Sequence, residues 1–307
     1  MPSSPLVPDE LRAGPFRSGQ ALSAGLSRRQ LQSDCWRHML HDVYAWVELP
    51  DDLALRMAAA ALILPAGAAF SHRTAAWLHR VDALSPESVP VATVPPGTAF
   101  SARDGLVVRQ APLRPGEISR RRGLPVTSPT RTAFDLARTE PGSEAVACVD
   151  AFLHAGLVDH ADLTRYVDGQ RRWRGVRLAQ RAVELADAAA ESPMESRLRM
   201  VLVDGGLPRP VVNAPLYDRH GVFLGRPDLR IAHVLIEYDG VGHREADVFG
   251  HDLRRQNGLV DGGYVVLRYG AGDIGGRAHL VVAQVRRALA TSPPILVKST
   301  STASPRG

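Results

Sequence analysis

This 307-residue sequence contains little cysteine, a single lysine and no long apolar run, and each shortage argues against a class of protein. The two cysteines, Cys35 and Cys148, form no CxxC pair and no cluster with histidine, so neither a disulfide framework nor a structural zinc site is expected. The longest apolar run, residues 57–70, is short and is interrupted by Pro65. We therefore expect a cytoplasmic protein without an export signal or a membrane span.

Nearly all the basic residues are arginine, because lysine occurs only at Lys298. The formal net charge of +5 and the isoelectric point near 9.7 favour a polyanionic partner, although an ordinary basic protein can carry the same excess. The GxSxG elbow, the P-loop and the HExxH motif are absent, which argues against serine hydrolases, NTPases and zinc proteases. The length predicts two or three domains.

The first 50 residues have the pattern of a winged helix-turn-helix. Residues 18–24 and 27–33 predict two short helices, and the alternating segment 36–47 predicts a pair of strands. With Ser27 as the N-cap of the second helix, Arg28, Arg29 and Gln30 fall in the first turn of a recognition helix, where they can meet phosphates or bases. The alternative, which the sequence leaves open, is that these side chains form a solvated helix face.

The middle region, residues 51–190, is predicted to mix helices and strands and has no catalytic motif. Residues 71–79 predict a capped helix with His72 and Arg73 turned outward, for which a structural role is favoured over metal ligation. The basic segment 171–174 either binds phosphate or forms a solvated turn with Trp173 packed inward, and the second interpretation is favoured.

The region from 191 to 290 predicts the order helix, three strands, helix, strand and helix. Residues 291–307, rich in serine, threonine and proline, are expected to be disordered. The whole chain is therefore predicted to be a multidomain protein of the α/β class in the broad, α+β sense. The expected elements of the C-terminal core are 193–204, 211–216, 222–231, 234–239, 246–261, 264–269 and 277–290.

Acidic residues stand at two points in the apolar strands of this core. Glu237 and Asp239 alternate along one strand and should share a face, where Asp228 from the neighbouring strand can join them. Three carboxylates at one place raise one another's pKa unless a cation lies among them, and hard oxygen ligands suit Mg²⁺ or Mn²⁺. The pattern predicts a divalent metal site able to hydrolyse a phosphodiester.

Two other patterns in this region have explanations that need no catalysis. Glu195 stands three residues after Ser192, with Pro193 between them, which is the S-x-x-E arrangement that caps a helix. Glu195 therefore remains ambiguous between a cap and a site residue. Residues 270–275 match GxGxxG, but neither a second parallel strand nor the acidic residue of a dinucleotide fold follows.

The segments GRPDLRI, LIEYDGVGH and HDLRRQNGLVDGGYVVLRY resemble the PD-(D/E)XK nuclease superfamily, nearest to domains similar to very-short-patch repair endonucleases. The resemblance implies a restriction-endonuclease-like αβββαβ core over residues 191–290 and metal-dependent DNA cleavage. It matches Asp228 to the PD aspartate, Glu237 to the acid of (D/E)XK and Glu195 to the acid of the first helix.

The chain departs from that pattern at Asp239, which stands where the family usually has lysine, and the core contains no lysine to replace it. Arginine remains protonated and cannot act as a general base. Asp239 can instead serve as a metal ligand and His243 as a general acid or base. The alternative is a turn after the strand and a surface-loop histidine. Arg255 and Arg268 are the expected DNA contacts of this core.

The segment VTSPTRTAFDLA, residues 126–137, together with the N-terminal pattern resembles AbiEi-type antitoxins. That resemblance implies DNA binding, transcriptional autoregulation and a cognate toxin or other protein partner.

The first functional hypothesis is therefore a Mg²⁺-dependent DNA endonuclease targeted by an N-terminal DNA-binding module. The alternative is a non-catalytic DNA-binding regulator, antitoxin-like, whose nuclease fold is degenerate. A third, weaker hypothesis is an RNA-directed nuclease, because carboxylates do not distinguish the two nucleic acids.

Overall fold

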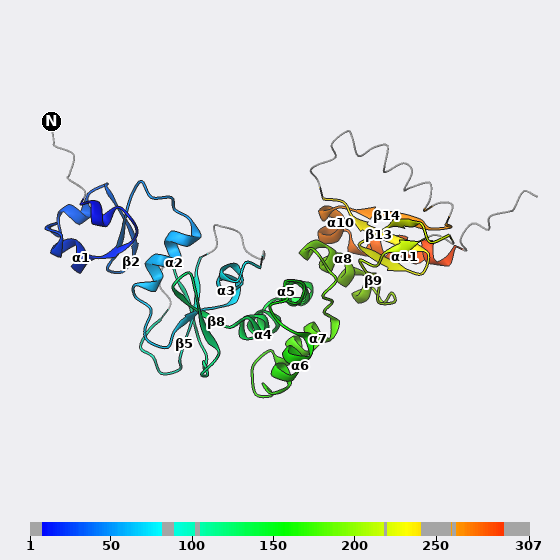
Figure 1. Ribbon diagram of the computed structural model, residues 1–307, viewed down its shortest axis with the longest axis horizontal. Coiled ribbons are helices and arrows are strands. Elements are labelled where there is room, and N and C mark those ends of the chain that lie inside the picture. The colour runs from blue at the N-terminus through cyan, green and yellow to red at the C-terminus, as the bar shows by residue number, and fades with distance from the viewer. Residues whose placement is uncertain are drawn as a thin grey trace, which may run out of the picture. The chain divides into compact units, whose positions relative to one another are not determined.

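A computed structural model describes residues 8–81, 89–101, 105–217, 220–240, 259 and 262–291 (Figure 1). The chain divides into two compact units, which are described separately below. The first unit comprises Met1–Thr139 and Ala155–Gln180, and the second comprises Glu140–His154 and Arg181–Gly307. The mixed α/β class predicted from the sequence is confirmed, since both units combine helices with sheets. Within the described ranges, no helix is both long enough and apolar enough to cross a bilayer.

The N-terminal module of the first unit, residues 8–49, is a three-stranded antiparallel sheet with short helical segments. Phe16 packs its ring edge-on against Trp36 with 5.1 Å between ring centroids, in a small apolar core of its own. The sheet has the order β1-β3-β2, and the elements are η1 (Asp9–Leu11), β1 (Phe16–Arg17), α1 (Ser18–Ser23), η2 (Gln30–Gln32), β2 (Trp36–Leu40) and β3 (Val43–Trp46).

The predicted helix at 18–24 and the predicted strand pair are present, but the helix expected at 27–33 is only the short 3₁₀ turn η2. Its first turn is closed by side chains: Ser27 N donates to Gln30 Oε1 at 2.8 Å, and Gln30 N donates to Ser27 Oγ at 3.3 Å. Ser33 Oγ then donates to the Gln30 carbonyl. Because side chains satisfy the backbone at both ends, the segment is stable as a single turn.

The rest of the first unit is built on a five-stranded mixed sheet with the order β6-β5-β4-β8-β7. Its core includes Phe70, Leu106 and Val126, all fully or almost fully buried. The strands are β4 (Ala69–Phe70), β5 (Val91–Val94), β6 (Val107–Gln110), β7 (Ile118–Arg121) and β8 (Leu124–Thr127). The helices are α2 (Leu53–Ala61), α3 (His72–Leu78), α4 (Pro129–Thr139) and α6 (His160–Asp168), and α7 (Val176–Leu185) begins in this unit.

Polar groups are buried between this sheet and its helices. The sequence prediction that His72 faces solvent is wrong, because His72 is 5% exposed and its Nδ1 lies 2.9 Å from Ser71 Oγ. Trp173 packs inward as predicted, edge-on to Phe134 and beneath the guanidinium of Arg131. These contacts make the 171–174 segment a packed turn of this unit.

The second unit has a four-stranded sheet with the order β14-β13-β12-β9, in which only the β13–β14 pair is parallel. A separate two-stranded sheet pairs β10 with β11. The strands are β9 (Val211–Val212), β10 (Leu216–Tyr217), β11 (Phe223–Gly225), β12 (Leu229–Ile231), β13 (Val234–Tyr238) and β14 (Val265–Tyr269). The helices are α5 (Gly142–His154), α8 (Pro193–Asp204), α10 (Ala271–Gly276) and α11 (Ala278–Ala290), together with the end of α7.

The predicted helices at 193–204 and 277–290 correspond to α8 and α11, and the predicted strands at 234–239 and 264–269 correspond to β13 and β14. The single strand expected at 222–231 is instead two strands in two sheets. Gly225 has a φ of +147°, and Pro227 has no N–H to donate to a ladder, so the chain leaves one sheet between β11 and β12 and enters the other. The helix expected at 246–261 lies outside the described residues except for Leu259.

Candidate nucleic-acid interface

The three residues predicted to contact DNA lie together at the start of η2. Arg28, Arg29 and Gln30 are all exposed. Gln30 has a local structural role, because its Oε1 accepts from both the backbone N–H and the hydroxyl of Ser27 at 2.8 Å. Arg28 and Arg29 are therefore the two side chains of this turn that can present a cation to a ligand.

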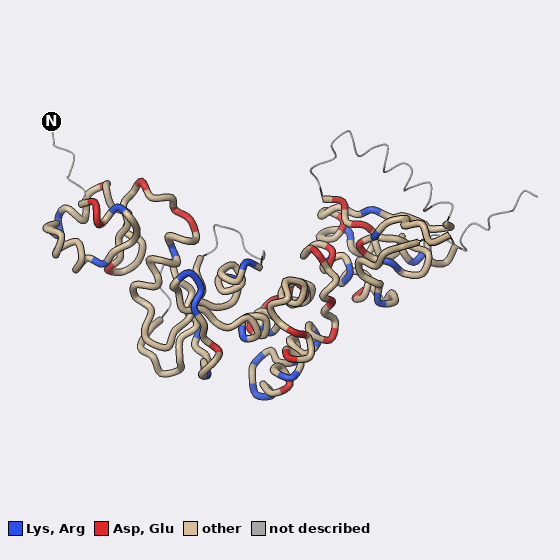
Figure 2. The backbone as a smooth tube through the Cα atoms, in the orientation of Figure 1, with Lys and Arg blue, Asp and Glu red and all other residues tan. Residues whose placement is uncertain are grey.

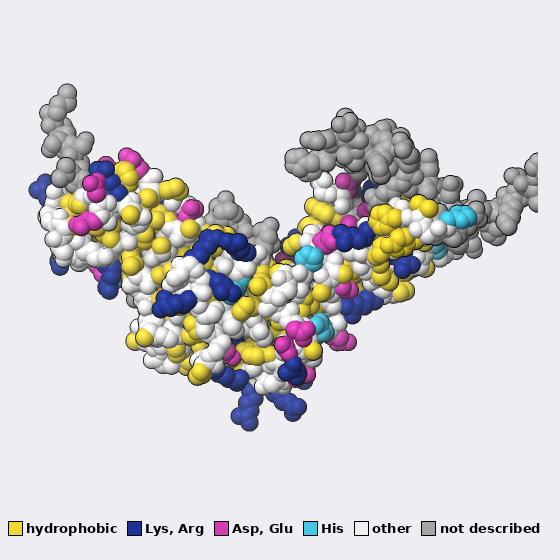
Figure 3. All heavy atoms as spheres, viewed as in Figure 1, with side chains coloured by type: hydrophobic (Ala, Val, Ile, Leu, Met, Phe, Trp, Pro, Cys, Tyr) yellow, Lys and Arg dark blue, Asp and Glu magenta, His cyan; other side chains and the backbone are white. Residues whose placement is uncertain are grey.

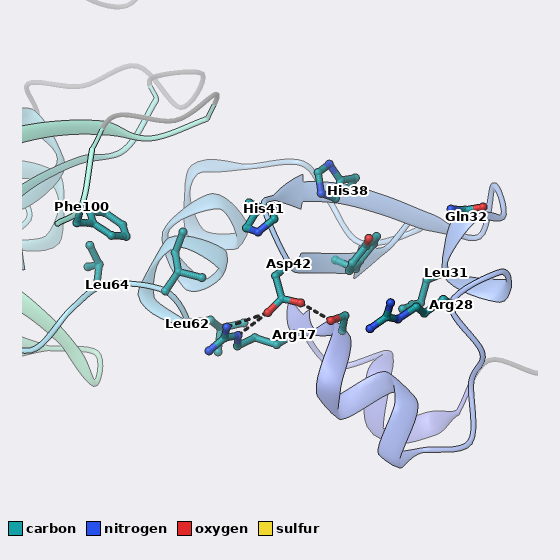
Figure 4. Close-up of a pocket in the computed structure, with 13 residues that line it drawn as sticks. Arg17, Arg28, Leu31, Gln32, His38, His41, Asp42, Leu62, Leu64 and Phe100 are labelled. Carbon is teal, nitrogen blue, oxygen red and sulfur yellow. Dashed lines mark hydrogen bonds and ion pairs between the residues drawn. The ribbon is translucent and has the colours of Figure 1, made fainter.

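A cleft of about 630 Å³ opens beside this turn (Figure 4). Arg28 reaches it from the turn before η2, and His38, His41 and Asp42 reach it from the β2–β3 hairpin. The far end is apolar. The lining residues are Arg17, Ser18, Arg28, Leu31, Gln32, His38, His41, Asp42, Tyr44, Leu62, Ile63, Leu64 and Phe100.

Asp42 is the acid of this cleft, and its charge is matched locally. The hydrogen bond from Ser18 Oγ lowers the pKa of Asp42, and the neighbouring guanidinium of Arg17 lowers it further, against the effect of partial burial. Arg17 holds the carboxylate at 2.8 Å and 2.9 Å through two nitrogens. Asp42 has a φ of +63° at the hairpin turn, so these contacts also fix the turn in a conformation that an aspartate tolerates.

Arg28 has no ion-pair partner within the part of the chain that the structure describes. With Arg17 and Asp42 compensating each other, the cleft carries the net positive charge of Arg28, and two histidines extend its polar wall. An arginine guanidinium offers a planar fork of N–H donors that matches phosphate oxygens. The arrangement can therefore bind an anion of the phosphate class at its mouth.

The structure places the predicted metal-binding carboxylates near the start of β12 and the end of β13, two antiparallel neighbours in the second unit's sheet, but gives two of them other partners. Asp228 Oδ2 accepts from Tyr238 N at 2.7 Å, which ties the carboxylate to the end of β13. Glu237 Oε2 lies 3.0 Å from Arg268 Nε on the adjacent strand β14. Asp239 follows β13, and its backbone N–H donates to the Tyr269 carbonyl.

The expected metal-binding cluster of Asp228, Glu237 and Asp239 is not found among the described residues, where no group of three acidic, histidine or cysteine side chains is arranged to hold a metal ion. The donor set that the nuclease resemblance implies for Mg²⁺ or Mn²⁺ therefore does not fit these residues as they stand. At two of the three positions one carboxylate oxygen has a protein partner: Oδ2 of Asp228 accepts from a backbone N–H, and Oε2 of Glu237 accepts from a guanidinium. Metal-dependent catalysis by these carboxylates stays a prediction.

Glu195 has the capping role that its spacing from Ser192 allows. Ser192 Oγ accepts from Glu195 N at 3.2 Å, and Glu195 Oε2 accepts from Glu191 N at 3.0 Å and from Asn213 Nδ2 at 2.8 Å. The side chain is nearly buried, so these bonds compensate its desolvation. The candidate catalytic role of Glu195 receives no support from this geometry.

The remaining predicted site residues divide between described and undescribed parts of the chain. Arg268 lies on β14 and is paired with Glu237, so its charge is directed at a carboxylate. His243 and Arg255 lie outside the described residues.

Sequence reasoning did not find the cleft residues Arg17, His38 and His41. A usable signal was present, since His38 and His41 flank the expected hairpin turn and Arg17 precedes the first predicted helix. It also passed over residues 120–122, three consecutive arginines followed by Gly123, which the structure places at the end of β7 and in the turn to β8. Gly123, which has a φ of +77°, is the turn signal of this segment.

Comparisons with known proteins find one matching family model and two similar mycobacterial proteins. The family model described as "AbiEi antitoxin C-terminal domain" matches residues 66–188, which hold the five-stranded sheet and the helices α3, α4, α5, α6 and α7. The family match ends at residue 188, before the predicted site acids Glu195, Asp228, Glu237 and Asp239. Two uncharacterized proteins of Mycobacterium tuberculosis, MT2308 and Rv2248, are each 32% identical to this chain over 206 residues, covering 66% of it and 72% of their own length.

Among solved structures, the crystal structure of the RV2827C protein from Mycobacterium tuberculosis matches with a TM-score of 0.39 and 14% identity. The match covers 67% of this chain and 84% of that chain. A TM-score at this level does not establish a common fold, so no functional argument follows from it.

Proposed function

Because this chain belongs to the family of the mycobacterial proteins MT2308 and Rv2248 and carries an AbiEi antitoxin C-terminal domain, we propose that it is a DNA-binding regulator of the antitoxin type. In this proposal the N-terminal module binds duplex DNA in the manner of a winged helix, with the turn η2 in the place of the recognition helix. Residues 66–188 take the antitoxin role and bind a cognate toxin or another protein partner.

The observation that carries the proposal is the pair of exposed arginines, Arg28 and Arg29, on the turn that leads into η2. In a winged helix-turn-helix this is the segment that approaches the major groove, and the hairpin formed by β2 and β3 is the wing beside it. The positively charged cleft between the two supports contact with phosphate, because Arg28 lines it and Asp42 is compensated by Arg17.

The proposal contains no catalytic step. Glu195 caps α8, Asp228 accepts from a backbone N–H and Glu237 is paired with Arg268, so the acids predicted for catalysis have structural partners. DNA binding by the N-terminal module requires none of them. We accordingly propose binding that is independent of divalent metal.

The test is fluorescence anisotropy of the full chain with a labelled duplex from the region immediately upstream of its own gene, compared with a random-sequence duplex. We expect tighter binding to the upstream duplex, unchanged by Mg²⁺ or EDTA. The combined Arg28→Ala and Arg29→Ala variant should weaken binding and reduce the salt dependence, log Kd against log salt, by about 2 units of slope, because each lost phosphate contact removes about 0.9.

Arg165→Ala is the matched control, since Arg165 is an exposed arginine of the same unit that is paired with Asp162 on α6. It should leave the affinity and the salt slope unchanged. Equal binding of wild-type protein to both duplexes, or an affinity that the Arg28 and Arg29 variant retains in full, would contradict the proposed role of this turn.

A further inference from the structure

Four exposed arginines gather at one corner of the first unit, away from η2 in the sequence. Arg120 and Arg121 are the last two residues of β7, Arg122 lies in the turn that joins β7 to β8, and Arg80 follows the end of α3. We refer to these four residues as the arginine corner. Figure 2 shows the three consecutive arginines as an unbroken blue run at this turn, and Figure 3 shows basic side chains gathered on this face of the unit.

Specific contacts position the arginine corner. The Arg122 guanidinium lies 4.9 Å from the centroid of the Trp77 ring, and Arg120 Nη1 donates to the Gly123 carbonyl at 2.8 Å across the turn. Arg80 N donates to the Trp77 carbonyl at 2.9 Å, which fixes the backbone of Arg80 at the C-terminal end of α3. A guanidinium stacked on an indole keeps the N–H groups on its edge available to a ligand.

His79, which is buried, lies at the C-terminal end of α3 next to Arg80. Burial lowers the pKa of His79, and the positive charge of Arg121 lowers it further, while a hydrogen bond with the Thr127 carbonyl opposes these effects. The contact between Arg122 and the Trp77 ring likewise joins the β7–β8 hairpin to α3. The hairpin and the C-terminal end of α3 form one continuous surface.

The positive charge of this surface is uncompensated. Across the described ranges of the chain, none of the four arginines has an ion-pair partner. β7 is also the edge strand of its sheet, so the turn projects where no further strand covers it. Four unpaired arginines at one corner create a local field that attracts polyanions.

We infer that the arginine corner is a second nucleic-acid contact of this protein, one that binds the phosphate backbone without reading sequence. The inference rests on the proposed function, because it assigns the same polyanionic ligand to a second surface. Arginine forks suit phosphate oxygens, and Trp77 serves as a platform that holds one of them.

The observations favour nucleic acid over an acidic protein partner. A protein interface has a buried apolar centre with charged residues at its rim, whereas the large apolar side chains that are well exposed in this unit do not include any residue of this turn or of α3. Backbone contacts with DNA need only cations with N–H donors and remain effective in a wet interface.

The experiment replaces Arg120, Arg121 and Arg122 together by glutamine, which removes the charge and keeps a hydrogen-bonding side chain on the turn. Anisotropy with labelled random-sequence duplex DNA should show about a tenfold weaker affinity and a salt slope lower by about 2 to 3 units. The corresponding triple lysine variant should retain most of the wild-type slope. Preference for the upstream duplex over random DNA should persist in the glutamine variant.

The matched control is the combined Arg171→Gln, Arg172→Gln and Arg174→Gln variant, which removes the same charge from exposed positions of the same unit. A loss as large in this control as in the hairpin variant would mean that only net charge matters and would overturn the inference. If the variant with glutamine at positions 120, 121 and 122 keeps the salt slope of the wild-type protein, the inference is overturned and the proposed function is unaffected.

Two further outcomes are decisive. Failure of the wild-type protein to bind any duplex would overturn the proposed function and the inference with it. If poly-L-glutamate binds the wild-type protein but not the hairpin variant, while DNA binding is the same for both, the corner is a site for an acidic protein and the inference is wrong. Arg80→Gln keeps the test valid should the triple glutamine variant fail to fold, because it removes one charge of the arginine corner without changing the hairpin and should lower the salt slope by about 1 unit. A wild-type slope in Arg80→Gln would then overturn the inference.

Discussion

Arg131 and Asp135 lie one turn apart on α4 and form a 2.8 Å ion pair in which both side chains are fully buried. The same guanidinium reaches Glu117 at 2.7 Å, and Tyr166 donates its hydroxyl to Glu117 at 2.6 Å. Arg138 holds the other oxygen of Asp135. The network joins the start of β7, α4 and α6, so it fixes the helices of the AbiEi-type domain against its sheet.

Asp135→Ala should destabilise the first unit by about 3 to 5 kcal/mol, because it leaves the buried Arg131 charge with one partner fewer. All four tryptophans, Trp36, Trp46, Trp77 and Trp173, lie in this unit, so urea unfolding followed by tryptophan fluorescence reports on it directly. Asp162→Ala, which breaks an exposed pair, should cost less than about 1 kcal/mol. Similar losses in the two variants would show that burial of the network is not its source of stability.

His72 should make the stability of the same unit depend on pH. Burial lowers the pKa of His72 from 6.5 to about 4 in the folded protein. As the pH falls from 6.5 towards 4, the unfolded chain binds a proton that the folded chain does not, so stability falls through this window by at most about 3 kcal/mol. Above pH 6.5 both states are neutral, and the effect is absent.

The check is His72→Asn, since asparagine tolerates the φ of +53° at this position and does not titrate. Urea unfolding at a series of pH values should show a shallower loss of stability for the variant than for wild type. Part of the slope should remain, because the pKa of His79 is also lowered by burial. A pH profile parallel to that of wild type would exclude His72 as its source.

Glu195 provides a test that separates a cap from a catalytic acid. Glutamine at this position can accept the same hydrogen bonds from Glu191 N and Asn213 Nδ2, so Glu195→Gln should be nearly neutral. Glu195→Ala should lose about 1 kcal/mol. Hydrogen exchange of α8 amides, measured by mass spectrometry, should therefore speed up in the alanine variant only. Equal acceleration in both variants would mean that the negative charge itself matters.

Asp228 should contribute to folding of the second unit without a metal. Asp228→Ala removes the acceptor of Tyr238 N and should cost about 1 to 3 kcal/mol, whereas Asp228→Asn keeps an acceptor and should cost much less. Thermal unfolding with Mg²⁺, Mn²⁺ or EDTA should give the same Tm for wild type. Metal-dependent plasmid nicking by the wild-type protein that Asp228→Asn abolishes would instead support the nuclease hypothesis.

The elements that the sequence predicted best are those with local signals. Helix α8 begins and ends where expected, because Ser192 caps it, Pro193 suits its first position and Gly205 follows its last residue. Strands β13 and β14 were found because they are short apolar runs. By contrast, β4 has only two residues and is defined by pairing with β5 and, through Phe70 and Val126, with β8, which no local pattern reveals.

The candidate site follows the same division. By itself, the sequence determined that Arg28 and Arg29 directly follow a cap at Ser27, because capping is a contact between near neighbours, although the helix predicted there is only the 3₁₀ turn η2. Only the tertiary structure decided what Asp228 and Glu237 contact, since their partners Tyr238 and Arg268 are set by strand register. The tertiary structure alone also places Trp77 under Arg122 and forms the cleft beside Arg28. Charge and local capping can be read along a chain, whereas the partner of each charge is set by the packing of segments that are distant in sequence.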